Sequence, residues 1–122
     1  RADYPALIEN AKPALRELLG AASYERRIAV LSACSLDEIN TVCTIMVLGR
    51  HSLYLRRKKP FNAPDAVFVR WAADLWTLRE QDKAGDIRYL CGKTDLREYL
   101  SQGLQLLRID LMKGGKNARE AR

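Results

Sequence analysis

The sequence predicts an all-α protein, a compact bundle of four to six helices around a central apolar helix. Apolar residues recur at helical spacing in several segments, capping residues precede three of them, and no segment alternates convincingly as a strand would. With 122 residues, 48% of them hydrophobic, the chain is long enough for one domain with a substantial core. We therefore expect a single helical domain over residues 1–112, followed by a basic C-terminal tail over residues 113–122.

The first helix is predicted over about residues 3–19. Asp3 is a suitable N-cap, Pro5 fits the first turn, and Gly20 is suited to end the helix. Pro13 interrupts the apolar pattern, and proline removes a backbone hydrogen bond from a helix interior. We therefore expect Pro13 to kink this helix or to split it in two.

The central helix is predicted over residues 35–49. Ser35 and Glu38 form the S-x-x-E capping box, in which each side chain accepts a hydrogen bond from the backbone N–H of the other residue. Apolar residues cover more than half of the circumference, which is typical of a core helix. Gly49 is expected to end it in the left-handed conformation. The preceding segment, residues 24–34, fits a helix or a short extended run. Periodicity does not distinguish the two, and a helix is the preferred interpretation.

A further helix is predicted over about residues 64–82, after the capping sequence Asn62-Ala63-Pro64-Asp65. Gly85 either ends this helix or weakens it. Trp76 lies away from the main apolar face, and beside it lie Val69, Ala72 and Ala73. The helix is thus expected either to pack between two core layers or to present Trp76 as an anchor for a partner, because tryptophan is enriched at interfaces. The main apolar face itself consists of Val67, Phe68, Trp71, Leu75 and Leu78.

Another helical turn or two is predicted up to Gly92, and the last helix is predicted from Thr94 to about Met112. Gly103 lies within the leucine stripe of that last helix. A glycine there costs about 1 kcal/mol of helix propensity but lets another helix approach closely. The stripe consists of Leu96, Leu100, Leu104, Leu107 and Leu111.

The positive charge is concentrated in two stretches. Residues 50–59 contain five cations and no acidic residue, and residues 113–122 contain four cations and one acidic residue. Together they contribute +8 to a formal total of +6, so the remaining residues sum to −2. A concentrated positive patch attracts negatively charged molecules over about a Debye length. The candidate residues for binding a partner or polyanion are Arg50, Tyr54, Arg56, Arg57, Lys58, Lys59, Lys113, Lys116 and Arg119.

We expect a non-enzymatic binding protein that contacts an acidic protein surface or nucleic acid through this basic surface. In a nucleic-acid-binding helical domain, the cations would contact phosphates and Tyr54 would stack on a base. In a structural subunit of a larger assembly, the tail and Trp76 would make protein contacts. Residues 56–59 also fit a nuclear-localisation pattern. The alternative to any binding role is that this segment is an ordinary solvated loop. A helix-turn-helix with its turn at Gly49 has weak support, because Lys58 falls where an apolar residue is needed.

No enzymatic activity is expected, because GxxxxGK[ST], GxGxxG, HExxH and GxSxG are all missing. The spacings of Cys34, Cys43, Cys91 and His51 fit no common zinc pattern, so no metal or cofactor is expected and the cysteines are predicted to be buried. Three cysteines without a CxxC pair favour an intracellular, reducing compartment such as the cytoplasm. The longest apolar run is far short of the roughly 20 residues of a membrane span, so no membrane contact is expected. The oligomeric state stays open.

Two stretches resemble a known family. Ile45–Arg50 closes an apolar helix with a Leu-Gly-Arg corner, and Tyr89–Leu104 has the form of a YLLG…L..YL..GL signature. Over about residues 36–108 the chain thereby resembles a small bacterial all-helical family, domain of unknown function 3775. The resemblance implies an all-helical fold, supplies no activity and carries over no functional residues. It also implies an acidic loop after the Leu-Gly-Arg corner, where this chain has Arg56–Lys59, and this charge reversal argues against a shared partner.

Overall fold

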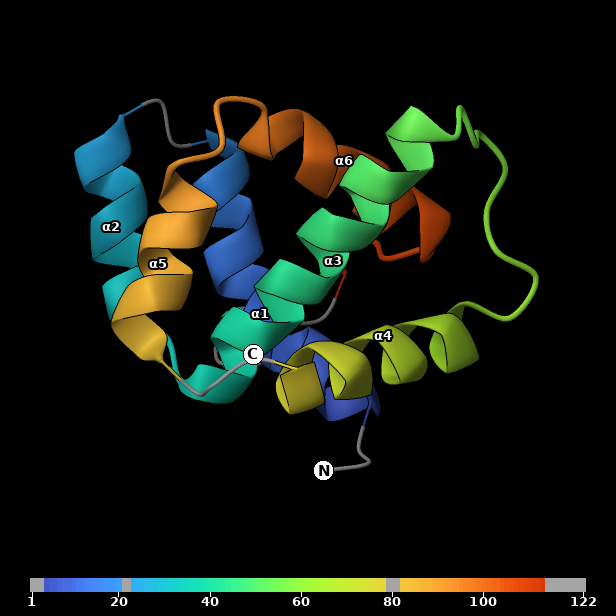
Figure 1. Cartoon of the computed structure of the whole chain (residues 1–122), viewed down its shortest axis with the longest axis horizontal. Coiled ribbons are helices and arrows are strands. Elements are labelled where there is room, and N and C mark those ends of the chain that lie inside the picture. Colours follow the sequence, from blue (N-terminus) through green and yellow to red (C-terminus); the bar gives the residue numbers. More distant parts are fainter. Residues whose placement is uncertain (1–3, 21–22, 79–81, 114–122) are drawn as a thin grey trace.

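A computed structural model of the chain describes residues 4–20, 23–78 and 82–113. Every element in these ranges is an α-helix, and α3 contacts α1, α4, α5 and α6. Figure 1 shows α3 running through the middle of the bundle, with α2 and α5 side by side at one end. The prediction of an all-α bundle around a central helix is confirmed. The six described helices are α1 (Tyr4–Gly20), α2 (Tyr24–Ser32), α3 (Leu36–Tyr54), α4 (Pro64–Leu78), α5 (Lys83–Cys91) and α6 (Leu96–Leu106).

Helix α1 is continuous through Pro13, so the predicted split into two helices is wrong. Ala11 and Leu15 are fully buried on either side of the proline and hold both halves of the helix against the core. Pro5 lies in the first turn, as expected. The predicted N-cap, Asp3, lies outside the described residues. Helix α2 confirms the helical interpretation of residues 24–34.

Helix α3 begins at the predicted capping box. The Ser35 N–H donates to Glu38 Oε1 at 3.0 Å, and the Glu38 N–H donates to Ser35 Oγ at 3.1 Å. Its predicted end is wrong, because the helix passes through Gly49 and continues to Tyr54. The helix-turn-helix with its turn at Gly49 is therefore contradicted as well.

The physical role of Gly49 is close packing. The most extensive contact in the fold joins α3 to α6, and a Cβ atom at Gly49 would overlap the carbonyl oxygen of Tyr99. A Cβ atom at Gly103 would likewise overlap the carbonyl oxygen of Ile45. The backbones of the two helices therefore touch where they cross, which confirms the close approach expected at Gly103.

The remaining boundaries differ from the sequence-based expectations. Helix α4 ends at Leu78, and residues 79–81 lie outside the described ranges. Gly85 belongs to the first turn of α5, where its N–H donates to the N-cap Asp82 Oδ1 at 3.1 Å, so it does not end α4. Helix α6 begins after Asp95, not Thr94, and ends at Leu106, six residues before Met112. The predicted glycine stop at residues 114 and 115 lies outside the described residues.

All described helices contribute to one hydrophobic core. Cys34, Cys43 and Cys91 belong to it as buried free thiols, which confirms that prediction. The core fixes the C-terminal ends of α3 and α6 relative to one another. The four consecutive cations of residues 56–59 follow directly after the end of α3. The fully buried large side chains include Leu15 of α1, Leu31 of α2, Ile39 of α3, Phe68 of α4, Leu90 of α5 and Leu100 of α6.

Candidate functional site

Four consecutive cations lie in the connection between α3 and α4, and we call Arg56, Arg57, Lys58 and Lys59 the basic cluster. All four side chains are exposed. In Figure 1 this connection is the green loop that leaves the C-terminal end of α3 beside the end of α6. The cluster therefore lies at one end of the central helix, where two helix C-termini carry partial negative charge that favours cations.

The backbone at the end of α3 fixes the positions of Arg56 and Arg57. The Arg57 N–H donates to the Ser52 carbonyl at 2.8 Å and the Arg56 N–H donates to the Leu53 carbonyl at 3.1 Å, a Schellman-type termination. Arg56 is left-handed, with a φ of 56°. Glycine usually occupies this position, because a Cβ atom is unfavourable there.

Helix α6 ends in the same way. The Ile109 N–H donates to the Leu104 carbonyl at 2.9 Å, and Arg108 is left-handed with a φ of 58°. This backbone conformation ends α6 well before Met112. Both helices that meet at this end of the bundle thus carry an exposed arginine at the position that favours glycine.

Two hydrogen bonds hold the loop against α6, and a third contact lies within the loop. The Gln102 side-chain amide donates to the Arg57 carbonyl at 2.8 Å, and the Phe61 N–H donates to the Leu106 carbonyl at 3.1 Å. The Arg57 guanidinium lies 4.5 Å from the centre of the Phe61 ring, a cation–π contact. The backbone of the basic cluster is thus anchored to α6, while its charged groups face solvent.

A cavity of about 580 Å³ opens between this loop and α6. Among the described residues its wall contains no acidic side chain, so the cations of the wall reinforce one another's positive potential. The arrangement offers charged and amide N–H donors, which suit phosphate or carboxylate oxygens. The wall consists of Leu53, Arg56, Arg57, Lys58, Gln102 and Gln105.

Tyr54 and Arg50 lie beside the basic cluster on the last turns of α3. Tyr54 is 75% exposed, and the neighbouring Leu55 is 67% exposed. Burial raises the pKa of Tyr99 on α6, a hydrogen bond with the Tyr54 side chain also raises this pKa, and half-buried Arg50 opposes both effects. Tyr54 therefore makes a polar contact with α6 beside the basic cavity, and the charge of Arg50 acts on the same tyrosine of α6.

The tail does not join this site where it is described. Lys113 lies against α1, because Lys12 Nζ donates to the Lys113 carbonyl at 2.6 Å and Arg16 Nε donates to the Leu111 carbonyl at 2.7 Å. Two further candidates, Lys116 and Arg119, lie outside the described residues.

Trp76 is half-buried in the last turns of α4. On the same helix face Val69 is 46% exposed and Ala73 is exposed, whereas Ala72 packs against the core. Asn40 Nδ2 donates to the Ala72 carbonyl at 3.4 Å, which ties this part of α4 to the start of α3. From Asn40 to Tyr54 the helix rises by about 21 Å, so Trp76 and the basic cluster are separate features.

Sequence reasoning missed the contribution of α6 to the site. Gln102 and Gln105 line the basic cavity, and the Arg108 N–H donates to the Gln105 carbonyl at 3.2 Å. These residues follow the basic cluster by more than forty positions, and tertiary packing alone brings them beside it. Nothing in their local sequence distinguishes them from ordinary exposed helix residues.

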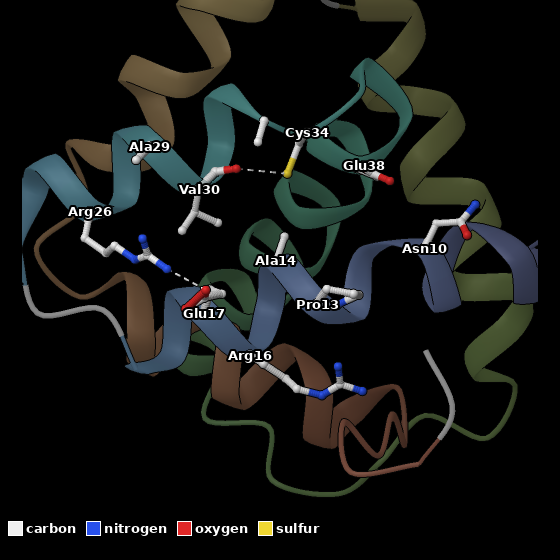
Figure 2. A pocket seen from close by; sticks show the side chains of 11 residues that line it. Asn10, Pro13, Ala14, Arg16, Glu17, Arg26, Ala29, Val30, Cys34 and Glu38 are labelled. Carbon is white, nitrogen blue, oxygen red and sulfur yellow. Dashed lines mark hydrogen bonds and ion pairs between the residues drawn. The ribbon is translucent and has the colours of Figure 1, made fainter. Parts of the chain in front are cut away.

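A second cavity, of about 640 Å³, lies between α1 and α2 (Figure 2). Its charges include both signs, and Arg26 Nη2 pairs with Glu17 Oε2 at 2.5 Å. Cys34 points into this region, and its thiol donates to the Val30 carbonyl at 3.4 Å. Burial, followed by the charge of Glu38, raises the pKa of Cys34 to about 11, against an opposing effect of Lys83. Because the thiolate is the nucleophile, this cysteine is poorly suited to covalent chemistry at neutral pH.

We expect Cys34 to make the fold sensitive to alkaline pH. Its pKa is higher in the folded state than its usual value of 9.0, so its stabilising contribution is complete below pH 9 and is lost as the pH rises through about 11. Urea unfolding of the wild type and of Cys34→Ala, at intervals from pH 8 to pH 11, measures this contribution. The difference between the two free energies of unfolding should shrink with rising pH, and a constant difference would contradict the assignment.

Among the described residues, no three His, Cys, Asp or Glu side chains lie close enough together to hold a metal ion. In the same part of the chain, no helix has the length and apolar character needed to cross a bilayer. Comparisons of the chain with family models, with curated proteins and with solved structures find no match. The resemblance to domain of unknown function 3775 therefore stays a prediction.

Proposed function

We propose that this chain is a non-enzymatic binding protein whose basic cluster contacts an acidic partner. The observation that carries the proposal is the wall of the basic cavity. Arg56, Arg57 and Lys58 converge there with two glutamine side chains, and no acidic side chain is among the described residues of that wall. Clefts lined by one sign of charge concentrate oppositely charged ligands and accelerate their association.

The backbone at Arg56 supports the same proposal. A residue with a Cβ atom in the left-handed region costs roughly 1–2 kcal/mol, and glycine would avoid this cost. The sequence has a cation at that position in α3 and again at Arg108 in α6. Strained positions are often found at functional sites, because the side chain there is needed for something other than stability.

Nucleic acid is the second candidate partner, and the exposure of Tyr54 favours it. An aromatic ring that is 75% exposed beside several cations resembles the stacking platforms of proteins that bind single strands. The same ring suits a protein interface, where tyrosine and arginine are enriched. The third candidate, a subunit of a larger assembly, rests on Trp76. This residue of α4 lies beside the start of α3, away from the basic cluster.

The substitution Arg56→Gly tests the proposal through two effects of opposite sign. The free energy of unfolding should rise by about 1 kcal/mol, because glycine adopts the left-handed conformation without strain. Affinity for a polyanion, measured with a short DNA duplex and with polyglutamate, should fall severalfold because a cation is lost.

Arg88→Gln is the matched control, because it removes one exposed cation from α5. It should change neither quantity appreciably. If Arg56→Gly stabilises the protein and leaves affinity for both polyanions unchanged, the cation at this position is not retained for binding and the proposal fails.

A further inference from the structure

A third cavity, of about 330 Å³, differs from the others in being almost entirely apolar. It lies between the first turns of α1 and α3 and one face of α4, so it is at the opposite end of α3 from the basic cluster. Six of its eight lining residues are apolar or aromatic, among them Tyr4, Leu7, Phe68 and Ala72. Cavities of about 300–1,000 Å³ with apolar walls and a few polar groups are typical of small-molecule sites.

The aromatic wall of this cavity is held in place by the core. Phe68 is fully buried, and its ring meets the ring of Tyr4 edge to face at a centroid distance of 5.0 Å. Burial, followed by the charge of Asp65 and a hydrogen bond with it, raises the pKa of Tyr4 to about 12. The Tyr4 hydroxyl therefore stays protonated as a donor to Asp65, and Asp65 adds a second carboxylate near the cavity. The space itself exists because α4 presents the small side chains of Ala72 and Ala73 there.

Besides the Tyr4 hydroxyl, the polar groups of the cavity come from α3, and both of them offer an acceptor oxygen. Asp37 and Asn40 are three residues apart, so they lie on the same face of the helix. The Asn40 amide nitrogen donates to the Ala72 carbonyl, which leaves its oxygen as the group that can accept from a ligand. Asp37 is the only charged side chain among the described residues of the wall.

An anion is poorly matched to this cavity, although it lies near a helix N-terminus. The Glu38 N–H of the first turn of α3 already donates to Ser35 Oγ. Two carboxylates, Asp37 and Asp65, add negative charge on this side of the molecule. A ligand for the cavity therefore needs an apolar body and a positively charged N–H donor.

We infer that this cavity binds a compact organic amine, with its apolar body against Phe68 and Tyr4 and its ammonium group at Asp37 and Asn40. Such binding is independent of the basic cluster, which lies about 21 Å along α3. It would add a small-molecule site to a protein whose other proposed site binds polyanions.

Titration of the full chain with three probes of similar size tests this inference. Phenethylamine carries a positive charge, phenethyl alcohol is neutral, and hydrocinnamate is negative. The amine should bind with a dissociation constant of about 1 mM or tighter and about three- to fivefold more tightly than the alcohol, since Asp37 is exposed. Hydrocinnamate should bind more weakly than either. Equal binding of all three probes, or binding of none at several times this concentration, would overturn the inference.

Two variants locate the site. Asp37→Asn should reduce the affinity for phenethylamine to that for phenethyl alcohol, while the affinity for the alcohol stays unchanged. Ala73→Leu should abolish binding of both, because it fills the cavity from an exposed position of α4. Thermal unfolding of each variant reports whether it is folded. If Ala73→Leu does not fold, the result with Asp37→Asn alone tests the location of the site. Unchanged preference for the amine in Asp37→Asn would contradict the assignment.

Discussion

Gly49→Ala and Gly103→Ala are each expected to destabilise the fold by about 3 kcal/mol or more. This expectation runs against helix propensity, since alanine is the better helix former by about 1 kcal/mol. The added methyl group would overlap the backbone carbonyl of Tyr99 in one variant and that of Ile45 in the other. A clash with backbone cannot be relieved by a change of side-chain rotamer. The two helices would have to separate along the most extensive contact of the fold.

Urea unfolding of the two variants measures this effect, and Gly20→Ala is the control. A Cβ atom at Gly20 would have nothing within 4 Å, so this variant should stay within about 0.5 kcal/mol of the wild type. An increase in stability for Gly49→Ala would mean that α3 and α6 do not cross at this point. Because Gln102 of α6 anchors the loop that carries Arg57, separation of the helices should also weaken polyanion binding.

The helices were predictable because apolar periodicity and capping residues are local signals. The Ser35–Glu38 capping box correctly places the start of α3. The helix end predicted at Gly49 is wrong because a glycine after an apolar run is typical both of a helix end and of a close helix crossing. Only the partner helix distinguishes a helix end from a helix crossing. Here the partner is α6, whose backbone meets Gly49 at Tyr99 and Gly103. The end of α6 was not predicted because Arg108 adopts the left-handed conformation there, and this conformation is usually recognised in a sequence by a glycine.

The candidate site was predictable only in part. The basic cluster is contiguous, so its charge is visible in the sequence, and its exposure follows from like-charge repulsion and hydration. The assignment of Lys113 to the same surface rested on charge alone, which carries no geometry, and the structure places Lys113 against α1. Gln102 and Gln105 come to the basic cavity through the packing of α6 on α3, which no local pattern indicates.

Neutralising the basic cavity should reduce polyanion binding by at least about a hundredfold at low salt. The triple variant Arg56→Gln, Arg57→Gln and Lys58→Gln removes every cation of its described wall. Each lost phosphate contact flattens the dependence of log K on log salt concentration by about 0.9 for duplex DNA. Stability should fall by at most about 1 kcal/mol, because only Arg57 makes a described contact that contributes to packing, the one with Phe61.

A second triple variant separates this local effect from the loss of net charge. Arg70, Arg88 and Arg97 are exposed on α4, α5 and α6, and changing each to glutamine also removes three positive charges. Both triple variants therefore lower the formal net charge from +6 to +3. A nonspecific attraction between the whole protein and a polyanion would weaken equally in both.

The decisive measurement is the slope of log K against log salt concentration for a short DNA duplex, and in parallel for polyglutamate, with the wild type and both triple variants. If the basic cluster is the binding site, the cavity variant loses about 2.7 from the slope with duplex DNA, while the charge-matched variant keeps nearly the wild-type slope. With polyglutamate the same order of affinities is expected. Identical slopes and affinities for the two triple variants would show that the basic cluster is an ordinary solvated loop and would contradict the proposed function.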